Sequence, residues 1–252
     1  TWWMITIGGL FAVVALLFTG LPPRVMWPFA MVSICIEATY FVTLSYAYHD
    51  NDFSLIYPVA RGSAPAFLTL WAFLFLHDQL TPMGMLGLGL IIGGLLIIGI
   101  NTLTQAHVTH LHFKGAAIAV FIALLISIYS ALDGTAVRHG FALPYVMAMF
   151  AFVPIPVTPL IFRQYSWEKI KGVLTSQPVR VPLAGVLGVL AYLMAVFSFS
   201  IAPLSYAGSI REVSVVFGAF AGWWFLKEKM GGVRLLGAII IFAGIIVIAI
   251  FG

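Results

Sequence analysis

Charged side chains are scarce in this chain. Asp, Glu, Lys and Arg make up 8% of its 252 residues, against about 25% in a typical soluble domain. Hydrophobic residues make up 62%, and no soluble core of this length could bury so much apolar surface. Apolar runs near the ~20 residues needed to cross a bilayer recur from end to end. The composition therefore excludes a soluble protein and predicts an all-α, multi-pass integral membrane protein of a bacterial inner membrane or a plasma membrane.

Cysteine and enzymatic motifs are also lacking. Cys35 is the only cysteine, so no disulfide can form within the chain. There is no nucleophile constellation, no phosphate-cradling glycine loop and no nucleotide-binding domain. His107, His110 and His112 share one polar stretch, but no thiol or carboxylate lies beside them. We therefore predict no enzyme, no cofactor, no metal site and no ATP-driven pump within this chain.

Nine apolar segments follow one another along the chain. Each has the composition of a transmembrane helix. They cover residues 3–18, 26–48, 53–76, 83–100, 115–137, 144–162, 181–201, 205–226 and 233–251. A polar connector at 101–114 and a basic loop at 163–180 interrupt the series.

The sequence contains an internal repeat. Residues 53–100 match residues 203–250 without a gap, at a constant offset of 150 positions. Arg61 then matches Arg211, and an acid that follows a Phe-Leu pair recurs as Asp78 and Glu228. Paired charges make chance similarity improbable, and a duplicated hydropathy pattern is typical of two-fold-related transporters.

The register of the repeat leaves one helix unmatched. Segments two to four match seven to nine and the first matches the sixth, so nothing matches the fifth. The simplest interpretation is an inverted five-plus-five helix repeat with the first helix missing, because five crossings per repeat reverse its orientation. The alternative is a nine-helix protein with a processed end. The predicted domains are a four-helix first repeat at 1–100, a connector at 101–114 and a five-helix second repeat at 115–252.

Basic residues are distributed unevenly over the loops. The loops after segments two, four, six and eight hold eight Lys and Arg residues, whereas the alternate loops hold only Arg24 and Arg138. The positive-inside rule therefore predicts a cytoplasmic location for the first set of loops and an external C-terminus.

These features resemble the drug/metabolite transporter superfamily, specifically an EamA-type permease. The resemblance rests on the proline-bearing start of the third segment, on the acid after Phe-Leu (Asp78 and Glu228) and on the glycine-spaced helix that follows. It covers essentially the whole chain as two divergent copies. It implies ten helices in inverted five-helix halves, both termini in the cytoplasm, and movement of small metabolites by alternating access. The absent first helix and the loop charges depart from that pattern.

Four charged residues lie far enough inside the apolar segments to be placed in the hydrocarbon region. They are Glu37, Arg61, Arg211 and Glu212. A charge in the hydrocarbon region costs several kcal/mol, with values contested between about 3 and above 10. Two acids and two bases form a neutral set, which fits pairing inside the helix bundle. We predict that they bind a substrate or a proton in a wet cavity, with Glu37 paired to an arginine. The alternatives are structural ion pairing between helices and arginines that extend to the interface from near the helix ends.

The third segment is the predicted discontinuous helix of that site. Pro58, Gly62 and Pro65 surround Arg61, and proline removes a backbone donor. Such breaks survive in a membrane only where protein or a wet cavity satisfies the freed groups. A kink without function is the alternative.

Weaker candidates complete the list. Tyr40, Tyr57 and Tyr206 could add hydroxyl groups to the cavity or lie at the membrane interface. Asp133 is either an acid near a loop or a carboxylate of the cavity.

Glycines spaced four apart predict close helix packing. Gly89 with Gly93, and Gly218 with Gly222, have the small-residue spacing that lets helix backbones approach.

Two classes of function remain. The leading one is a secondary transporter, not driven by ATP, that moves small metabolites such as amino acids or related organic solutes, with proton coupling as one version. A transporter half of a larger complex is a variant of it. The other class is a permease-fold subunit that serves as a structural or assembly component of a larger membrane complex. The expected partners are a small-molecule substrate and the lipid bilayer, and no nucleic acid. A homodimer and a membrane-complex partner are both left open.

Overall fold

The computed structural model describes residues 1–50, 53–76, 78–105, 110–138, 140–214, 217 and 232–251. Within these ranges, the side chains at 48–50, 53–59, 62, 99, 102–105, 110–113, 116 and 234 are not described. The regular elements of these ranges are all helices, with no strand among them.

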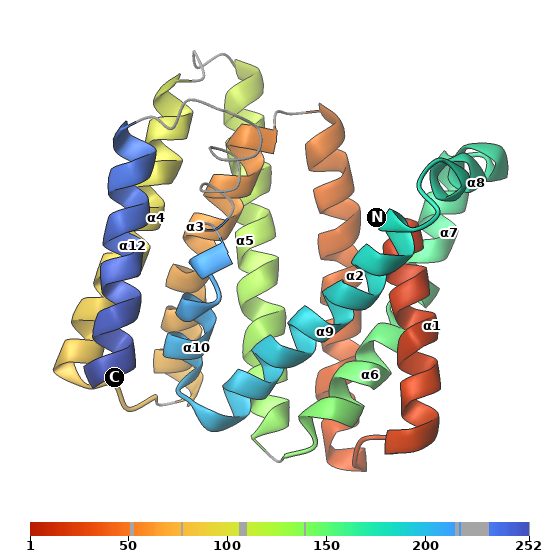
Figure 1. The fold of residues 1–252 in the computed structure, drawn as a ribbon, viewed down its shortest axis with the longest axis horizontal. Coiled ribbons are helices and arrows are strands. Elements are labelled where there is room, and N and C mark those ends of the chain that lie inside the picture. Colours follow the sequence, from red (N-terminus) through yellow and green to blue (C-terminus); the bar gives the residue numbers. More distant parts are fainter. Residues whose placement is uncertain are drawn as a thin grey trace. The chain divides into compact units, whose positions relative to one another are not determined.

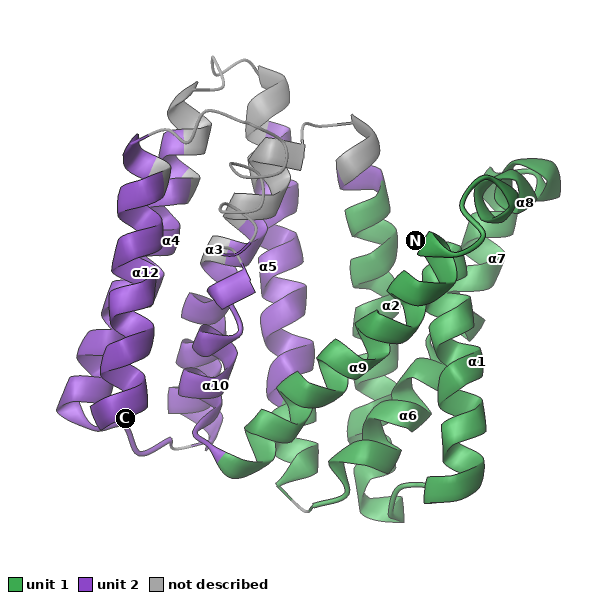
Figure 2. Ribbon diagram, in the orientation of Figure 1, with its two compact units in different colours: residues 1–45, 132–201 green, residues 46–131, 202–252 purple. Residues whose placement is uncertain are grey.

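The chain forms two compact units, which are coloured separately in Figure 2. Unit 1 comprises Thr1–Ser45 and Leu132–Ile201, and unit 2 comprises Tyr46–Ala131 and Ala202–Gly252. Each unit takes helices from both predicted repeats. The repeat boundaries stay a prediction, because compactness does not test the equivalence of two sequence copies.

Among the described residues, five helices have the length and apolar composition to cross a membrane. They cover Trp2–Thr19, Arg24–Ala47, Ala117–Val137, Ala142–Gln164 and Arg180–Ile201. Shorter apolar helices cover Ser63–Leu76, Pro82–Ile98 and Leu235–Phe251. The prediction of a multi-pass membrane protein is confirmed. The number of nine spans stays a prediction, since most of segment 205–226 lies outside the described residues.

Unit 1 is built around α1 (Trp2–Thr19), which packs against α6 (Ala142–Phe152), α7 (Pro154–Gln164) and α9 (Arg180–Ile201) (Figure 1). The short helix η1 (Arg24–Met26) leads from α1 into α2 (Trp27–Asp50). Small residues allow the close contacts of α1. A Cβ atom on Gly9 would lie 2.9 Å from the carbonyl oxygen of Phe150.

The predicted segment 144–162 lies in the span Ala142–Gln164, which is divided at Val153 into two helices. α6 ends at Phe152 and α7 begins at Pro154. Proline has no N–H to donate, so Pro154 cannot bond back to the carbonyl of Phe150. The hydrogen-bond pattern is therefore interrupted here, although the backbone of Val153 keeps helical angles.

The predicted basic loop 163–180 contains a helix, α8 (Trp167–Ser176). Ile170 is buried, and the indole N–H of Trp3 donates to its carbonyl oxygen at 2.7 Å. Lys169 and Lys171 are exposed. The segment is therefore an amphipathic helix, which polarity alone did not distinguish from a loop.

Unit 2 contains α3 (Phe53–Trp71), the π-helical turn η2 (Ala72–Leu76), α4 (Pro82–Gln105), most of α5 (His110–Val137), α10 (Leu204–Ile210) and α12 (Gly232–Phe251). α4 packs against α3, α10 and α12, and α10 also packs against α3. Both α4 and α5 extend into the predicted connector 101–114, because a helix satisfies its own backbone hydrogen bonds whether its side chains are apolar or polar.

The contact between α4 and α12 is reciprocal. The two helices run antiparallel (Figure 1). A Cβ atom on Gly87 would lie 2.8 Å from the carbonyl oxygen of Gly244, and one on Gly244 would lie 2.5 Å from that of Gly87. Gly94 and Gly237 face each other in the same way, at 2.8 and 3.0 Å. At the repeat offset Gly87 is equivalent to Gly237, and Gly94 is equivalent to Gly244. The contact of Gly87 with Gly244 and the contact of Gly94 with Gly237 are therefore made by equivalent residues.

The predicted packing role of Gly89 and Gly93 is wrong. A Cβ atom on either residue would meet no described atom within 4 Å. Gly87 and Gly94 are two helical turns apart and share one face of α4, and it is this face that meets α12. The other predicted pair, Gly218 and Gly222, lies outside the described residues.

This contact yields a stability prediction. Gly94→Ala places a methyl group against the backbone of α12, and overpacking of this kind typically costs about 1–3 kcal/mol. Gly93→Ala meets no such atom and gains helix propensity of about 1 kcal/mol. We expect the first variant to lower the melting temperature of the detergent-purified protein by several degrees, and the second to leave it unchanged or raise it. Equal shifts in both variants would contradict the glycine contact.

Candidate functional site

Three of the four predicted intramembrane charges meet in unit 2. Arg61 lies on α3, and Arg211 and Glu212 directly follow α10. Arg61 Nη1 lies 3.5 Å from Glu212 Oε1, and Arg211 Nε lies 3.6 Å from the same oxygen. The Glu212 side chain is fully buried, whereas 28% of the Arg61 side chain and 18% of the Arg211 side chain are exposed. One carboxylate oxygen thus faces two guanidinium groups, and the trio carries one excess positive charge.

Three buried polar atoms beside this trio have no hydrogen-bond partner among the described residues. They are Ser209 Oγ, Arg211 Nε and Glu212 Oε2. Buried polar atoms in proteins are nearly always hydrogen-bonded. The end of α10 therefore has bonding capacity left for water or for a polar solute. Arg211 Nη1 also lies 3.5 Å from the hydroxyl oxygen of Ser130 on α5.

The backbone is irregular where these residues lie. α10 ends at Ile210, and the N–H of Glu212 donates to the carbonyl of Ser209 at 3.0 Å, a tighter turn than that of an α-helix. A Cβ atom on Gly208 would overlap the side chain of Leu68 on α3. Glycine at this position therefore lets α10 approach α3 closely enough for Glu212 to reach Arg61.

The acidic position of the repeat motif holds the other end of α10. Asp78 Oδ2 accepts hydrogen bonds from both the N–H and the hydroxyl of Ser205, each at 3.1 Å. Tyr206, predicted to offer its hydroxyl to the cavity, is buried and accepts a hydrogen bond from the N–H of Thr81 at 3.0 Å. Both contacts anchor the start of α10 to the turn before α4. Glu228, the equivalent of Asp78, lies outside the described residues.

Glu37 belongs to the other unit. It lies on α2 with 3% of its surface exposed, and its Oε2 has no hydrogen-bond partner among the described residues. The predicted pairing of Glu37 with Arg61 or Arg211 stays a prediction, since the two units are described separately. Tyr40, on the same helix, is half-buried with its ring centroid 5.0 Å from that of Phe41.

The predicted helix break is not visible in the secondary structure of α3. This helix is continuous from Phe53 to Trp71. The side chains of Tyr57, Pro58 and Gly62 are not among the described ones, and Pro65 is buried. A kink at these residues stays a prediction. The irregular backbone described in unit 2 lies in η2 and directly after α10.

A second polar cluster lies in unit 1. The hydroxyl of Tyr145 donates to Asp133 Oδ1 at 2.8 Å, and the hydroxyl of Tyr192 donates to Asp133 Oδ2. Asp133 and Tyr145 are fully buried. The sequence holds a signal for Asp133, because Ser127, Ser130 and Asp133 recur every third residue and all three are buried. The two tyrosines carried no such signal, since membrane tyrosines usually mark the interface.

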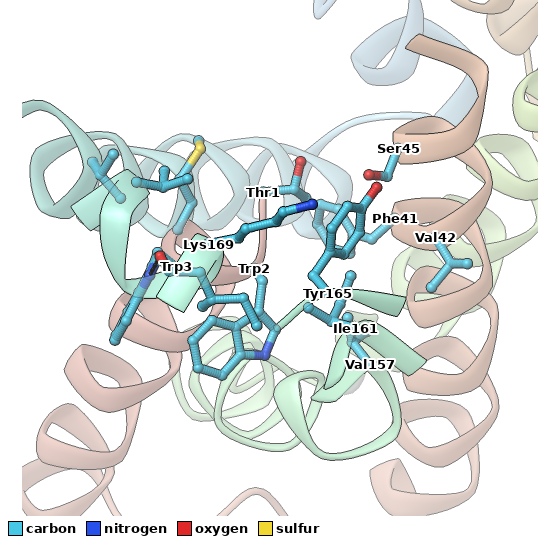
Figure 3. Close-up of a pocket in the computed structure, with 14 residues that line it drawn as sticks. Thr1, Trp2, Trp3, Phe41, Val42, Ser45, Val157, Ile161, Tyr165 and Lys169 are labelled. Atoms are coloured by element: carbon cyan, nitrogen blue, oxygen red, sulfur yellow. Dashed lines mark hydrogen bonds between the residues drawn. The ribbon is translucent and has the colours of Figure 1, made fainter. Parts of the chain in front are cut away.

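Unit 1 also contains a pocket of about 390 Å³. Its lining is mostly apolar, Lys169 supplies its only charged side chain, and none of the predicted site residues lines it (Figure 3). No group of three or more His, Cys, Asp or Glu residues gathers among the described part of the chain. His107 lies outside the described residues, as do the side chains of His110 and His112.

Comparisons with known proteins agree with this architecture. The model of the EamA-like transporter family matches residues 114–250, more than half of the chain. A solved structure titled "Crystal structure of protein" is similar with a TM-score of 0.76 and 18% identity, over 100% of this chain and 88% of its own. At this identity the likeness shows the fold alone. A search of curated proteins found no match.

The anchoring of α10 yields a second prediction. Asp78→Ala removes the acceptor of both Ser205 hydrogen bonds, and loss of such a helix cap typically costs about 1 kcal/mol. We expect faster hydrogen–deuterium exchange over residues 204–212 in the variant, measured by mass spectrometry. Asp78→Asn keeps an acceptor oxygen and should exchange more slowly than the alanine variant. Unchanged exchange in Asp78→Ala would contradict the anchoring role.

Proposed function

Because the chain belongs to the EamA-like transporter family, we propose that it is a secondary transporter that moves small metabolites with a carboxylate or another anionic group by alternating access. The sequence resemblance to this family is confirmed, and the family is one of transporters rather than of enzymes. Amino acids and related organic acids are the solutes that fit the proposal best.

The observation that carries this proposal is that Arg61 and Arg211 both contact Glu212 Oε1. Ser209 Oγ and Glu212 Oε2, beside this contact, have no hydrogen-bond partner among the described residues. Guanidinium groups present planar, paired donors that match a carboxylate. A solute carboxylate would replace Glu212 as the partner of Arg61 and Arg211. The Ser209 hydroxyl, which has no hydrogen-bond partner among the described residues, would then give the solute a further hydrogen bond.

The repeat suggests how the site takes part in alternating access. Arg61 and Arg211 occupy equivalent positions of the two predicted copies. An antiparallel pair of equivalent helices is what a two-fold axis in the membrane plane generates, and the reciprocal contacts of α4 and α12 support such an inverted repeat. A solute held by both arginines would bridge the two copies.

A purely structural ion cluster is the alternative that this geometry disfavours. Structural ion pairs are stabilising when additional hydrogen bonds satisfy the remaining donors and acceptors. Here Ser209 Oγ and Glu212 Oε2 lack hydrogen-bond partners among the described residues, and Arg211 Nε lies 3.6 Å from Glu212 Oε1, just beyond hydrogen-bond distance. Buried polar atoms without hydrogen-bond partners are expected in a site where Glu212 and a solute carboxylate alternate as partners of the arginines.

Counterflow in proteoliposomes tests the proposal. Vesicles with the purified protein are loaded with unlabelled amino acids and organic acids, and entry of trace labelled solute is followed. We expect counterflow for at least one carboxylate solute. Its ester or amide, which keeps the shape and lacks the charge, should compete at least tenfold less well. Counterflow for none of the solutes, or equal competition by the ester, would contradict the proposal.

Substitution of the arginines should reduce that counterflow. A hydrogen bond to a charged group contributes about 1.5–3 kcal/mol, so Arg61→Ala and Arg211→Ala should each lower apparent affinity roughly tenfold or more. Lys169→Ala and Lys171→Ala are matched controls on α8, where both side chains are exposed, and should leave counterflow near wild type.

Since an alanine at either arginine weakens the pairing of a buried Glu212, the conservative variant Arg211→Lys guards against misfolding. It keeps the positive charge and loses the paired geometry, and it should show an intermediate loss in a protein with normal elution on size-exclusion chromatography. If the Arg61→Ala and Arg211→Ala variants lost no more counterflow than the Lys169→Ala and Lys171→Ala controls, a role for the arginines in solute binding would be contradicted.

A further inference from the structure

The pocket of unit 1 lies where three helices with the composition of membrane spans have their ends. Trp2 is the first residue of α1, Tyr165 directly follows α7, and Ser45 lies near the end of α2. All three line the pocket, together with Lys169 and Ile170 of the amphipathic helix α8. The ends of membrane spans lie at the boundary between hydrocarbon and lipid headgroups. The pocket is therefore at the level of the headgroups.

Tryptophan rings hold the walls of the pocket together. The ring centroid of Trp3 lies 4.8 Å from that of Trp2 and 6.0 Å from that of Trp167. The indole N–H of Trp2 donates to the hydroxyl of Thr158 on α7 at 3.0 Å, and that of Trp3 donates to the carbonyl of Ile170 on α8 at 2.7 Å. These contacts join α1 to α7 and α8. Tryptophan is also enriched at membrane interfaces, which agrees with the level of the pocket.

Polar and apolar groups occupy different sides of the pocket. The ammonium group of Lys169 and the hydroxyl groups of Tyr165 and Ser45 lie on one side, and Val157 and Ile161 lie on the other (Figure 3). The volume of about 390 Å³ falls within the range of about 300–1,000 Å³ that is usual for small-molecule sites. A fully polar ligand would leave the apolar side unfilled. A ligand with a polar head and an apolar chain matches both sides.

The charge around the pocket favours an anionic head. Residues 163–180 contain four basic residues, Arg163, Lys169, Lys171 and Arg180, and one acid, Glu168. All five side chains are exposed, and Lys169 is the one of them that lines the pocket. Basic residues at the end of a span or on an amphipathic helix attract anionic lipids. The cytoplasmic location predicted for this segment agrees, because anionic lipids give the cytoplasmic leaflet its negative surface potential.

We propose that this pocket binds one anionic phospholipid of the surrounding bilayer. Lys169 and Tyr165 donate hydrogen bonds to the phosphate group, and the upper part of one acyl chain lies against Val157 and Ile161. A zwitterionic lipid adds a positive headgroup charge that the basic residues repel, and a water-soluble phosphate has no chain for the apolar side. The pocket belongs to unit 1 and the proposed solute site to unit 2, so lipid binding does not rest on the proposed function.

Native mass spectrometry of the delipidated full chain in detergent tests the headgroup contact. The probes are dioleoyl phosphatidylglycerol and dioleoyl phosphatidylcholine, which have the same acyl chains and differ in headgroup charge. We expect one phosphatidylglycerol to bind roughly fivefold or more tightly than phosphatidylcholine. Lys169→Ala should lose most of that preference, whereas Lys171→Ala, the same change on α8 outside the pocket lining, should keep it. Equal affinity for the two lipids, or equal losses in the two lysine variants, overturns the proposal.

A second pair of variants tests the apolar side of the pocket. Val42→Trp places a large ring into the pocket from α2, and Val32→Trp makes the same change at an exposed position of that helix. Each buried CH₂ of an acyl chain stabilises binding, so Val42→Trp should weaken phosphatidylglycerol binding roughly tenfold, and Val32→Trp should not. Both variants are compared at normal elution on size-exclusion chromatography.

Glycerol phosphate, which has the phosphate and no acyl chain, distinguishes a lipid from a free phosphate. It should not displace bound phosphatidylglycerol at equal concentration. Displacement by glycerol phosphate would assign the pocket to a soluble phosphate, and unchanged lipid binding in Val42→Trp would remove the acyl chain from it. Either result overturns the proposal.

Discussion

The fully buried carboxylate of Glu212 is the constraint on which the arrangement of unit 2 depends. An uncompensated charge in a low-dielectric interior costs several kcal/mol, so α3 and the end of α10 must lie close enough for arginines to reach it. Gly208 allows that approach, and Asp78 fixes the opposite end of α10 through Ser205. The packed pair of α4 and α12 then supports the turn on which α10 is anchored. The proposed solute site would thus lie between packed helices, although its own backbone is irregular.

Hydropathy predicted the helices well because twenty apolar residues in sequence leave few alternatives in a membrane. The offset of the repeat even predicted which residues of α4 and α12 are equivalent, and their contacts are reciprocal. Spacing alone failed at Gly89 and Gly93, since a four-residue motif does not say which helical face meets a neighbour. Proline content alone did not predict the interruption at Pro154. A proline can begin a helix, where its missing N–H breaks no hydrogen bond, so its presence does not say whether a helix ends, begins or continues there.

The site could be predicted only in part. Arg61, Arg211 and Glu212 could be identified from the sequence because a charged side chain inside an apolar segment costs several kcal/mol unless it is paired or solvated. The four charges predicted inside the membrane sum to zero, but a sum cannot say which acid pairs with which arginine. The ion pairs described for both arginines are with Glu212. The tyrosines around Asp133 gave no signal in the sequence, because a phenol that positions a carboxylate and one that lies at the interface look alike there.

The central proposal is that the end of α10 forms a water-accessible site with excess positive charge. In a Cys35→Ser background, which removes the only native cysteine, Ser209→Cys places a thiol where the buried hydroxyl has no described partner. Reaction rates of this thiol with water-soluble anionic and cationic thiosulfonate reagents are then compared in vesicles. The account predicts that the anionic reagent reacts at least tenfold faster and that a carboxylate solute slows it. A thiol that reacts with neither reagent, or faster with the cationic one, would contradict the account.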